Sequence, residues 1–411
     1  MRYGLLGEKL GHSFSPQIHA MLGCEGYGLI EVPRDGLDGY MRRRDFDAIN
    51  VTIPYKQAVM PYCDEIDPAA KAIGCVNTII NDGGRLLGYN TDFSGLLHMA
   101  CMSDIDFFGK NVLILGTGGT SLTAEAAAKL RGANSVRKVS RSGEINYENA
   151  PELCADTEIL VNTTPVGMYP HNGRMAIDPA LFPKLTGVLD VVYNPLSTAL
   201  VLRAKELGLN CSGGLPMLVA QAVHAEELFT GRIISLDVFE SVLRRIDAQA
   251  RSIILMGMPG CGKSSLGRLL AERTGRDFAD IDELVERSAG MPIPRIFAER
   301  GESAFRDIES QVLAEAAKHG GGIIALGGGS VLREENRRAI VQNGFVVYIR
   351  RPVGALPTEG RPLSGDGSGL AEMYARRDPI YSALANCECE NSGTLDSLAD
   401  EVLKKFENRV I

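Results

Sequence analysis

Two stretches of the chain repeat one pattern of apolar and polar positions. Each begins with a short apolar run, continues through a glycine-rich turn and ends in an alanine- and leucine-rich segment: NVLILGTGGTSLTAEAAAKL (111–130) and SIILMGMPGCGKSSLGRLLAERTG (252–275). A buried strand, a tight turn and a helix open a parallel α/β unit, in which backbone N–H groups at the helix N-terminus hold a phosphate. The pattern predicts two nucleotide sites, and the unlike glycine spacings predict two different nucleotides.

Shorter patterns divide the rest of the chain. Residues 1–95 contain three short strands (YGLLG, AINVTI and NTIIN) between turn residues, which predicts a separate lobe, with catalytic groups between lobes. Residues 234–247 place apolar side chains at 238, 239, 242, 243 and 246, one face of an amphipathic helix. The next strand follows closely, so we place a domain boundary near residue 250, with almost no free linker and restricted relative motion. The Gly/Ser stretch at 364–369 is predicted to be a mobile loop.

Composition and charge narrow the possible partners. The 411 residues are 45% hydrophobic, enough for at least two domains with cores of their own. A net charge of -8 argues against nucleic acid and anionic membranes, and no apolar run approaches the roughly 20 residues of a spanning helix. The nine cysteines show no C-x-x-C spacing, and the closest pair is the C-x-C of Cys387 and Cys389, which indicates a reducing compartment. The polar start of the sequence, which lacks an export signal, is consistent with this location. We therefore expect a cytoplasmic protein with small-molecule ligands.

The first glycine turn has the spacing of a dinucleotide-binding fold. Gly116, Gly118 and Gly119 follow a strand and open a helix, with Ser121 at the third fingerprint position, although such a turn is weak support by itself. One strand later, where an acidic residue would hold the ribose of NAD, the chain reads VRKVSRSG. A guanidinium and two hydroxyls suit a 2′-phosphate, so we expect NADP(H) rather than NADH. The expected NADP(H) contacts are Gly116, Gly118, Gly119, Thr120, Ser140, Arg141 and Ser142.

The second glycine turn is a stronger signal. GMPGCGKS (257–264) satisfies G-x-x-x-x-G-K-[ST] after a strand and before a helix. Backbone N–H groups of this turn are expected to cradle the β-phosphate of ATP, Lys263 to bridge the β- and γ-oxygens, and the Ser264 hydroxyl to ligate Mg²⁺. The expected ATP contacts are Gly260, Cys261, Gly262, Lys263, Ser264 and Ser265. The turn does not identify the phosphate acceptor.

Eight motifs over residues 1 to about 246 resemble shikimate dehydrogenase in content and order. They are GHSFSPQIH (11–19), NVTIPYK (50–56), GCVNTI (74–79), GYNTDFSG (88–95), GTGGT (116–120), NTTPVGM (162–168), DVVYNP (190–195) and GLPMLVAQAVHAEELFTG (214–231). The resemblance implies reduction of 3-dehydroshikimate to shikimate with NADPH. The implied site residues are Ser13 and Ser15 for the substrate carboxylate, Thr52, Asn77 and Gln221 for the ring hydroxyls, Tyr193 for the substrate or the nicotinamide, and Lys56 and Asp92 as the catalytic pair.

Ketone reduction itself requires a pair of this kind. Hydride transfer to the carbonyl carbon leaves a developing alkoxide, which must be stabilised and protonated by a group within hydrogen-bond reach. The Lys56 ammonium can do both, and a neighbouring Asp92 carboxylate would orient it and tune its proton affinity. Two bland interpretations stay open at this point: Lys56 as a solvated surface lysine and Asp92 as a helix cap beside Asn90. We interpret His12 and His19 as structural residues.

Five motifs after the second turn resemble shikimate kinase over residues 252 to about 390: FADIDELVE (278–286), IFAERGESAFRDIE (296–309), IIALGGGSV (323–331), RPL (361–363) and RRDPIY (376–381). The resemblance implies phosphorylation of shikimate by ATP, with Gly327 to Gly329 close to the ring and the γ-phosphate. Planar guanidinium groups match a carboxylate, and an arginine that arrives with a lid stabilises the transferring phosphoryl group. The implied site residues are Asp280 beside Ser264 for Mg²⁺, Asp282, Arg306, Gly328 and Arg377 for shikimate, Asp282 also as proton acceptor or orienting group for the attacking hydroxyl, and Arg361 with Lys263 for the phosphoryl group.

The two resemblances together predict a bifunctional α/β protein of three parts. Residues 1–95 form an α/β substrate-binding lobe completed by helices at 215–248, residues 96–214 form a Rossmann NADP-binding lobe, and residues 251–411 form a P-loop kinase domain of the nucleoside-monophosphate-kinase type with a central parallel sheet. Such an enzyme catalyses consecutive steps of aromatic amino acid (chorismate) biosynthesis. Its expected partners are 3-dehydroshikimate and shikimate, without nucleic acid or membrane, and its oligomeric state stays open between monomer and homodimer. We expect release of shikimate between the sites, because a small metabolite usually diffuses away before turnover.

Some features depart from the family patterns or leave alternatives open. Residues 23–50 look short, which leaves the outer helices of the first lobe open, and only eight residues separate Pro352 from Arg361, which leaves the lid and the adenine contacts open. Arg306 and Arg377 can also be read as members of surface ion pairs. Three alternative functions stay open: a dehydrogenase half that prefers quinate or accepts NADH, a regulator that binds pathway intermediates without turnover, and a fusion with one inactive half.

Overall fold

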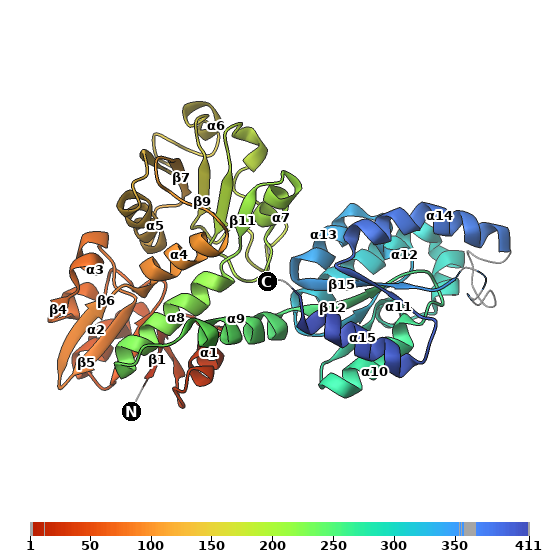
Figure 1. Ribbon diagram of the computed structural model, residues 1–411, viewed down its shortest axis with the longest axis horizontal. Coiled ribbons are helices and arrows are strands. Elements are labelled where there is room, and N and C mark those ends of the chain that lie inside the picture. Colours follow the sequence, from red (N-terminus) through yellow and green to blue (C-terminus); the bar gives the residue numbers. More distant parts are fainter. Residues whose placement is uncertain (1–2, 12, 353, 355, 357–366, 410–411) are drawn as a thin grey trace. The chain divides into compact units, whose positions relative to one another are not determined.

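The computed structural model describes residues 3–11, 13–352, 354, 356 and 367–409 and divides into two compact units (Figure 1). Unit 1 is Met1–Ile246 and unit 2 is Asp247–Ile411. The predictions for His12 and Arg361 lie outside the described residues. Within the described part of the chain, every helix is too short or too polar to cross a bilayer.

Unit 1 begins with a six-stranded mixed sheet. Its elements are β1 (Tyr3–Gly7), α1 (Ser15–Met21), β2 (Gly28–Glu31), η1 (Arg34–Gly36), α2 (Leu37–Arg43), β3 (Ala48–Val51), η2 (Met60–Tyr62), β4 (Glu65–Ile66), α3 (Pro68–Ile73), β5 (Thr78–Asp82) and β6 (Arg85–Tyr89). The strand order is β2-β1-β3-β5-β6-β4, with β1 parallel to β2 and β3 and with β5 antiparallel to β3 and β6. The three predicted strands are confirmed as β1, β3 and β5, whose apolar side chains fill a core around Leu6, Ile49 and Ile79.

The second sheet of unit 1 is parallel throughout. Its elements are α4 (Thr91–Met102), β7 (Asn111–Leu115), α5 (Gly119–Leu130), β8 (Ser135–Val139), α6 (Ala150–Leu153), β9 (Ile159–Asn162), η3 (Pro179–Leu181), β10 (Gly187–Asp190), α7 (Ala199–Glu206), β11 (Asn210–Ser212) and α8 (Leu215–Thr230), with strand order β11-β10-β9-β7-β8. The predicted strand and helix at 111–130 are confirmed as β7 and α5. Helices α4 and α8 pack side by side (Figure 1); α4 also contacts α5, and α8 also contacts α1 and β5.

Helix α9 (Leu236–Ala250) follows α8. It confirms the helix predicted at 234–247, with shifted ends. The buried stripe consists of Phe239, Val242, Leu243 and Ile246. The prediction was wrong at Val238, whose side chain is 40% exposed. Successive helical residues are about 100° apart, so a residue directly before the stripe points away from its centre.

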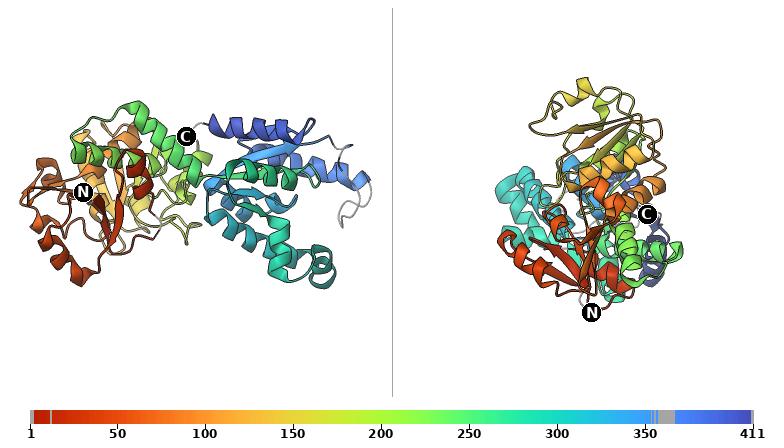
Figure 2. Two further views of the ribbon diagram at one scale, coloured as in Figure 1. Left: turned by 90° about the horizontal axis from the view of Figure 1, so that it is seen from below. Right: turned by 90° about the vertical axis from the view of Figure 1, so that its left-hand side faces the viewer.

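Unit 2 contains a five-stranded parallel sheet. Its elements are β12 (Ser252–Met256), α10 (Lys263–Thr274), β13 (Phe278–Asp280), α11 (Ile281–Ala289), α12 (Ile293–Lys318), β14 (Ile323–Ala325), η4 (Ser330–Leu332), α13 (Glu334–Asn343), β15 (Gly344–Arg350), α14 (Gly367–Leu384), β16 (Cys387–Glu390) and α15 (Leu395–Glu407), with strand order β13-β14-β12-β15-β16. Helices cover both faces of the sheet (Figure 2). The predicted strand and helix at 252–275 are confirmed as β12 and α10.

The prediction of a mobile loop at 364–369 was wrong for its second half. Residues 367–369 begin α14, and residues 364–366 lie outside the described part of the chain. The first turn of a helix tolerates glycine and serine because its N–H groups have no intrahelical acceptors in any case.

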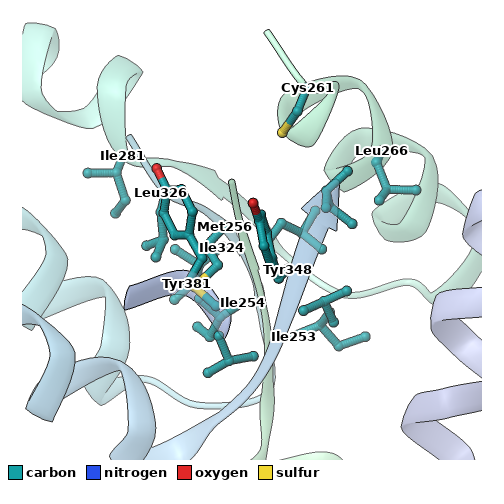
Figure 3. Packing of buried hydrophobic residues seen from close by; sticks show 14 of the residues in the cluster. Ile253, Ile254, Met256, Cys261, Leu266, Ile281, Ile324, Leu326, Tyr348 and Tyr381 are labelled. Atoms are coloured by element: carbon teal, nitrogen blue, oxygen red, sulfur yellow. The ribbon is translucent and has the colours of Figure 1, made fainter. Parts of the chain in front are cut away.

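The core of unit 2 lies directly beneath the second glycine turn. Ile254 and Met256 of β12 pack in one cluster with Leu326, which follows β14 (Figure 3). The Cys261 side chain belongs to the same cluster and is fully buried. Because this packing is rigid, the backbone of the turn is held in place at the carboxyl end of β12.

Candidate active sites

Lys56 and Asp92 form an ion pair in unit 1. The Lys56 Nζ and Asp92 Oδ2 atoms are 2.5 Å apart, and the two side chains are only 14% and 9% exposed. This burial is inconsistent with a solvated surface lysine. Asp92 does not cap α4 either, because Asn90 is the N-cap residue and accepts a hydrogen bond from the Phe93 N–H. The geometry is that of an ammonium group held in position by a carboxylate.

Strand ends place the expected substrate residues of unit 1 at one edge of the mixed sheet. Thr52 follows β3, and Ser13 and Ser15 lie in the segment between β1 and the start of α1, so both groups follow the carboxyl edge of parallel strands. Asn77 precedes the antiparallel β5, and its carbonyl accepts a hydrogen bond from the Val51 N–H at 2.7 Å. The hydroxyls of Ser13 and Ser15 are 3.1 Å apart. The two serines are thus paired, and Asn77 is hydrogen-bonded to the residue that precedes Thr52.

The ion pair lies against the first glycine turn. A Cβ added at Gly119 would be 3.6 Å from the Cβ of Lys56. The Cys75 thiol donates to the Gly119 carbonyl at 3.5 Å, and the Asn90 side chain donates to the Cys75 carbonyl at 3.0 Å. Gly119 is the first residue of α5, so the unpaired N–H groups of a helix N-terminus adjoin the Lys56 side chain. The expected dinucleotide turn and the expected proton donor therefore share one site.

The expected NADP(H) residues occupy two adjacent strand ends. The Gly116 N–H donates to the Val139 carbonyl at 2.9 Å, which joins the end of β7 to the end of β8. Gly116 has a φ of 108°, which favours glycine, and a Cβ at Gly118 would meet open space. Arg141 is solvent-exposed. An open glycine turn near an exposed guanidinium fits a dinucleotide with a 2′-phosphate. Gly118, Gly119 and Thr120 lie at the start of α5, whereas Ser140, Arg141 and Ser142 lie in the turn after β8.

Tyr193 and Gln221 come from other elements. The centroid of the Tyr193 ring lies 6.1 Å from that of the Phe14 ring. Phe14 stands between Ser13 and Ser15, the two serines expected to bind the substrate carboxylate. Burial raises the pKa of the Tyr193 hydroxyl, so this group is protonated at neutral pH. Gln221 lies on α8 and donates to the Leu218 carbonyl at 2.9 Å. Its Cβ is 3.1 Å from the position of a Cβ added at Gly95 of α4.

A buried polar network supports this sheet edge. His19 Nδ1 is 3.0 Å from a carboxylate oxygen of Glu226, and the His19 ring stacks on Tyr27 with 3.9 Å between centroids. The Tyr27 hydroxyl donates to Asn50, and the Asn50 amide donates to Thr78. Burial lowers the pKa of His19, despite the opposing effect of Glu226, and disfavours a charged ring. The position agrees with a structural role for His19.

Unit 2 has a cavity of about 580 Å³ where β12 and β14 end. The Lys263 ammonium donates to the carbonyl oxygens of Gly257 and Met258 at 3.0 and 3.1 Å. Cys261 contributes its backbone to the turn, while its side chain points into the core. The expected residues that line the cavity are Gly260, Gly262, Lys263, Ser264, Ser265, Asp280, Asp282, Arg306, Gly328 and Arg377.

A hydroxyl and two carboxylates meet at one end of this cavity. The Ser264 hydroxyl donates to Asp280 Oδ2 at 2.5 Å, and Asp280 caps α11 by accepting from the Asp282 N–H at 3.0 Å. Desolvation by the cavity walls, reinforced by the charge of Asp280, raises the pKa of Asp282 to about 6. A hydroxyl beside a carboxylate fits Mg²⁺, which takes its remaining ligands from phosphate and water. Among the described residues, no cluster of three or more His, Cys, Asp or Glu side chains offers an alternative metal site.

A buried carboxylate aims Arg306 into the cavity. Arg306 Nη1 donates to Glu309 Oε2 at 2.7 Å, and the other Glu309 oxygen accepts from the Ser330 hydroxyl at 2.6 Å. Glu309 is fully buried and Arg306 is 9% exposed, so this is not a surface ion pair. A Cβ at Gly329 would collide with the Arg306 guanidinium, and one at Gly327 would lie 2.6 Å from Asp282 Oδ1. The glycine run therefore lets the backbone pass between Arg306 and Asp282, two of the residues expected to bind shikimate.

Arg377 reaches the same glycine run from α14. Arg377 is 3% exposed, and its Nη1 donates to the Gly328 carbonyl at 2.9 Å. The Tyr381 hydroxyl donates to the same oxygen. Two of the expected shikimate residues are thus in direct contact. Arg361 lies outside the described residues, and its contact with the phosphoryl group stays a prediction.

Sequence reasoning missed three residues of this site. The Glu309 carboxylate accepts a hydrogen bond from Arg306, and the Tyr381 hydroxyl donates to the Gly328 carbonyl. Arg351 donates to the Gly260 carbonyl at 3.2 Å. The spacing of Glu309 three residues after Arg306 on one helix was a usable signal, since such side chains meet. Arg351 follows β15 at the ligand-binding edge of a parallel sheet. For Tyr381 the RRDPIY motif held no physical signal.

Comparisons with known proteins agree with this geometry. Residues 5–79 match the family model of the shikimate dehydrogenase substrate binding domain, and residues 259–407 match that of shikimate kinase. A shikimate dehydrogenase (NADP(+)) of Clostridium perfringens (strain SM101) is 39% identical over 249 residues, which cover 56% of this chain and 92% of the relative. The chain belongs to the shikimate dehydrogenase family and carries a shikimate kinase domain.

Solved shikimate dehydrogenases share the fold of the N-terminal part. Shikimate dehydrogenase 1 of Peptoclostridium difficile matches with a TM-score of 0.56 and 34% identity, covering 60% of this chain and 97% of that one. The Thermus thermophilus enzyme, solved with NADP(H) and shikimate, matches with a TM-score of 0.54 and 33% identity, covering 60% and 99%. A chorismate mutase/shikimate 5-dehydrogenase fusion protein from Clostridium acetobutylicum matches with a TM-score of 0.57 and 32% identity, covering 60% and 96%. A shikimate dehydrogenase fused to another enzyme thus has a precedent.

Proposed function

We propose that this protein reduces 3-dehydroshikimate to shikimate with NADPH and phosphorylates shikimate with ATP. One observation carries the proposal: in each unit a phosphate-binding glycine turn adjoins side chains that suit a hydroxylated carboxylic acid. In unit 1 the Lys56–Asp92 pair lies against Gly119. In unit 2 Arg306 and the other residues expected to bind shikimate line the same cavity as the glycine turn at 257–264. The two family matches name the acid.

The side chains of unit 1 bind and protonate the ketone. The Ser13 and Ser15 hydroxyls bind the substrate carboxylate, and Thr52, Asn77 and Gln221 bind the ring hydroxyls. The turn from Gly116 to Thr120 holds the pyrophosphate of the cofactor, and the turn after β8 holds the 2′-phosphate. NADPH supplies the hydride. Lys56 gives its proton to the oxygen that becomes the new hydroxyl, and Asp92 keeps the ammonium oriented throughout.

The side chains of unit 2 fix the new hydroxyl in front of the phosphate. Arg306 and Arg377 bind the shikimate carboxylate, and the Asp282 carboxylate orients the attacking hydroxyl and accepts its proton. Lys263 contacts the β- and γ-phosphates of ATP, and Ser264 with Asp280 holds Mg²⁺, which screens the phosphate charge. The Glu309 carboxylate keeps Arg306 in place.

The same proposal extends to organisation and location. Residues 1–95 with helices at 215–248 bind shikimate, residues 96–214 bind NADP(H), and residues 251–411 form the kinase. We place the protein in the cytoplasm, an assignment supported by nine cysteines that are all free thiols. Its products feed aromatic amino acid biosynthesis.

Two matched variants test the proposal. The purified protein, supplied with 3-dehydroshikimate, NADPH and MgATP, is expected to form shikimate 3-phosphate, detected by mass spectrometry. Lys56→Ala should slow ketone reduction by about 10²–10⁴-fold and still phosphorylate added shikimate, and Lys263→Ala should show the reverse. Absence of the phosphorylated product with the unmodified protein would contradict the function. Loss of both activities in either variant would contradict independent sites.

A substrate panel separates the alternatives. Quinate with NADP⁺ is expected to react more slowly than shikimate with NADP⁺. Likewise, 3-dehydroshikimate is expected to react more slowly with NADH than with NADPH. A faster rate with either would assign the dehydrogenase half to that substrate or cofactor. Binding of both acids without turnover would instead indicate a regulator.

A further inference from the structure

Cys387 and Cys389 form a thiol pair on the edge strand of unit 2. They lie two residues apart on β16, so their side chains point to the same face of the strand. Cys389 is 2% exposed, whereas Cys387 is partly exposed. One thiol therefore reaches solvent, and its partner is buried on the same face of the strand.

Side chains of α15 set the charge around this pair. The Lys405 ammonium lies 3.6 Å from Cys389 Sγ, and Glu401 Oε1 lies 2.6 Å from the same ammonium. The neighbouring Cys389 thiol, helped by the charge of Lys405, lowers the pKa of Cys387 against the opposing effects of burial and Glu401. The pKa of Cys389 is raised by the Cys387 thiol and by burial. Cys387 is thus the accessible thiol, and Cys389 is its buried neighbour beside an ammonium group.

The end of β16 is coupled to the glycine turn of the kinase. Asn391, directly after the strand, donates its N–H to the Arg350 carbonyl and its side-chain amide to the Cys261 carbonyl, both at 2.8 Å. A Cβ at Gly262 would lie 2.6 Å from Asn391 Nδ2, so the packing between the residue and the turn is tight. The position of the turn therefore depends on a residue two places after Cys389.

We propose that Cys387 and Cys389 are a redox modification site at which a hydroperoxide forms a disulfide that lowers kinase activity. The Cys387 thiolate attacks one oxygen of hydrogen peroxide, the O–O bond breaks, and a sulfenic acid forms on Cys387 while the other oxygen leaves as water after taking up a proton. The Cys389 sulfur then attacks the Cys387 sulfur, its proton goes to the departing hydroxyl, and a second water leaves. Two thiols lose two electrons to the peroxide and become one disulfide.

Strand geometry makes this disulfide disruptive. Residues two apart in an extended strand have Cα atoms about 6.6 Å apart, near the upper limit of roughly 6.8 Å for a disulfide and above its usual spacing. The bond therefore contracts β16 between its ends. Asn391 moves with the strand, and its two hydrogen bonds, to Arg350 and to the Cys261 carbonyl of the turn, weaken. The dehydrogenase activity belongs to unit 1, which does not contain β16, and serves as an internal control.

The test treats the full-length protein with hydrogen peroxide, blocks remaining thiols and maps disulfides by peptide mass spectrometry. We expect a Cys387–Cys389 disulfide, a rise of about tenfold in the KM for ATP, recovery with dithiothreitol, and an unchanged dehydrogenase rate. Cys387→Ser should keep kinase activity and resist peroxide. Cys101→Ser removes an exposed thiol elsewhere and should remain as sensitive as the unmodified protein.

Three results would overturn the inference: both thiols still open to blocking after peroxide, a disulfide without any change in kinase activity, or equal inactivation of Cys387→Ser. The activity readout rests on the proposed kinase function, but the peptide map does not. A protein without kinase activity before treatment would contradict that function, and the map would still decide whether the disulfide forms.

Discussion

Arg141 is the side chain expected to select the phosphorylated cofactor. Its guanidinium is exposed in the turn after β8. Arg141→Ala should raise the KM for NADPH by about 10- to 100-fold and leave the KM for NADH nearly unchanged, because a charge-assisted contact with the 2′-phosphate is lost. Steady-state rates with both cofactors measure this change.

Arg137→Ala is the matched control. Arg137 lies on β8, and its guanidinium pairs with Asp156. Its removal should leave the ratio of NADPH to NADH activity as it is. An unchanged ratio in Arg141→Ala would assign cofactor selection to other residues.

Titration of Asp282 is expected to give the pH profile of the kinase an acid limb, in which the rate falls as the pH falls. Its pKa is raised to about 6, so the carboxylate is ionised above this pH and protonated below it. Because the ionised form accepts the proton, the kinase rate should fall about tenfold per pH unit below pH 6. The pH dependence of kcat/KM for shikimate checks this limb, because kcat/KM reports groups of the free enzyme.

Asp282→Asn separates this titration from that of the substrates. The variant should be slow and should lack the acid limb, while its dehydrogenase rate shows that the protein is folded. A limb of the same shape in Asp282→Asn would assign the titration to a different group.

The contact between α4 and α8 depends on Gly95. Alanine usually stabilises a helix by about 0.5–1 kcal/mol over glycine. At Gly95, however, a Cβ would lie 2.9 Å from the Met217 carbonyl and 3.1 Å from the Gln221 Cβ. The helices must then move apart, at about 1–3 kcal/mol. Gly95→Ala should lower Tm, and it should raise the KM for 3-dehydroshikimate because Gln221 is displaced.

Gly39→Ala is the control for this substitution. Gly39 also lies inside a helix, α2, but the nearest atom to an added Cβ is the flexible end of Arg43 at 3.8 Å. This variant should gain stability. Equal stability of the two variants, measured by thermal unfolding, would show that α4 and α8 have room to adjust.

The two activities in one chain do not by themselves imply channelling. We expect shikimate to leave unit 1 and to reach unit 2 by diffusion. An equimolar mixture of Lys56→Ala and Lys263→Ala should then form shikimate 3-phosphate with the same lag and final rate as the unmodified protein at equal concentrations of each active site. A clearly shorter lag for the unmodified protein would show transfer without release.

Fold class, the two nucleotide turns and the two family resemblances were predictable from the chain alone. Strands such as YGLLG and turns such as GMPGCGKS are written in consecutive residues, where backbone preference and periodicity act locally. The same local rules failed at Val238 and at 367–369, where a helix face and a helix start depended on what packs nearby. Helix and strand positions are therefore better predicted than their exact exposure and ends.

The chemistry of the chain was determined by its sequence, and the contacts that organise this chemistry were decided by its tertiary structure. The family resemblances in the sequence suggested Lys56 with Asp92 and Arg306 with a carboxylate ligand. Packing over long separations decided that Lys56 lies against Gly119 and that Ser330 holds the Glu309 carboxylate beside Arg306. Packing also joined the end of β16 to the glycine turn of the kinase. Hydrogen bonds and close contacts between distant residues depend on how whole elements pack, and no local pattern encodes that geometry.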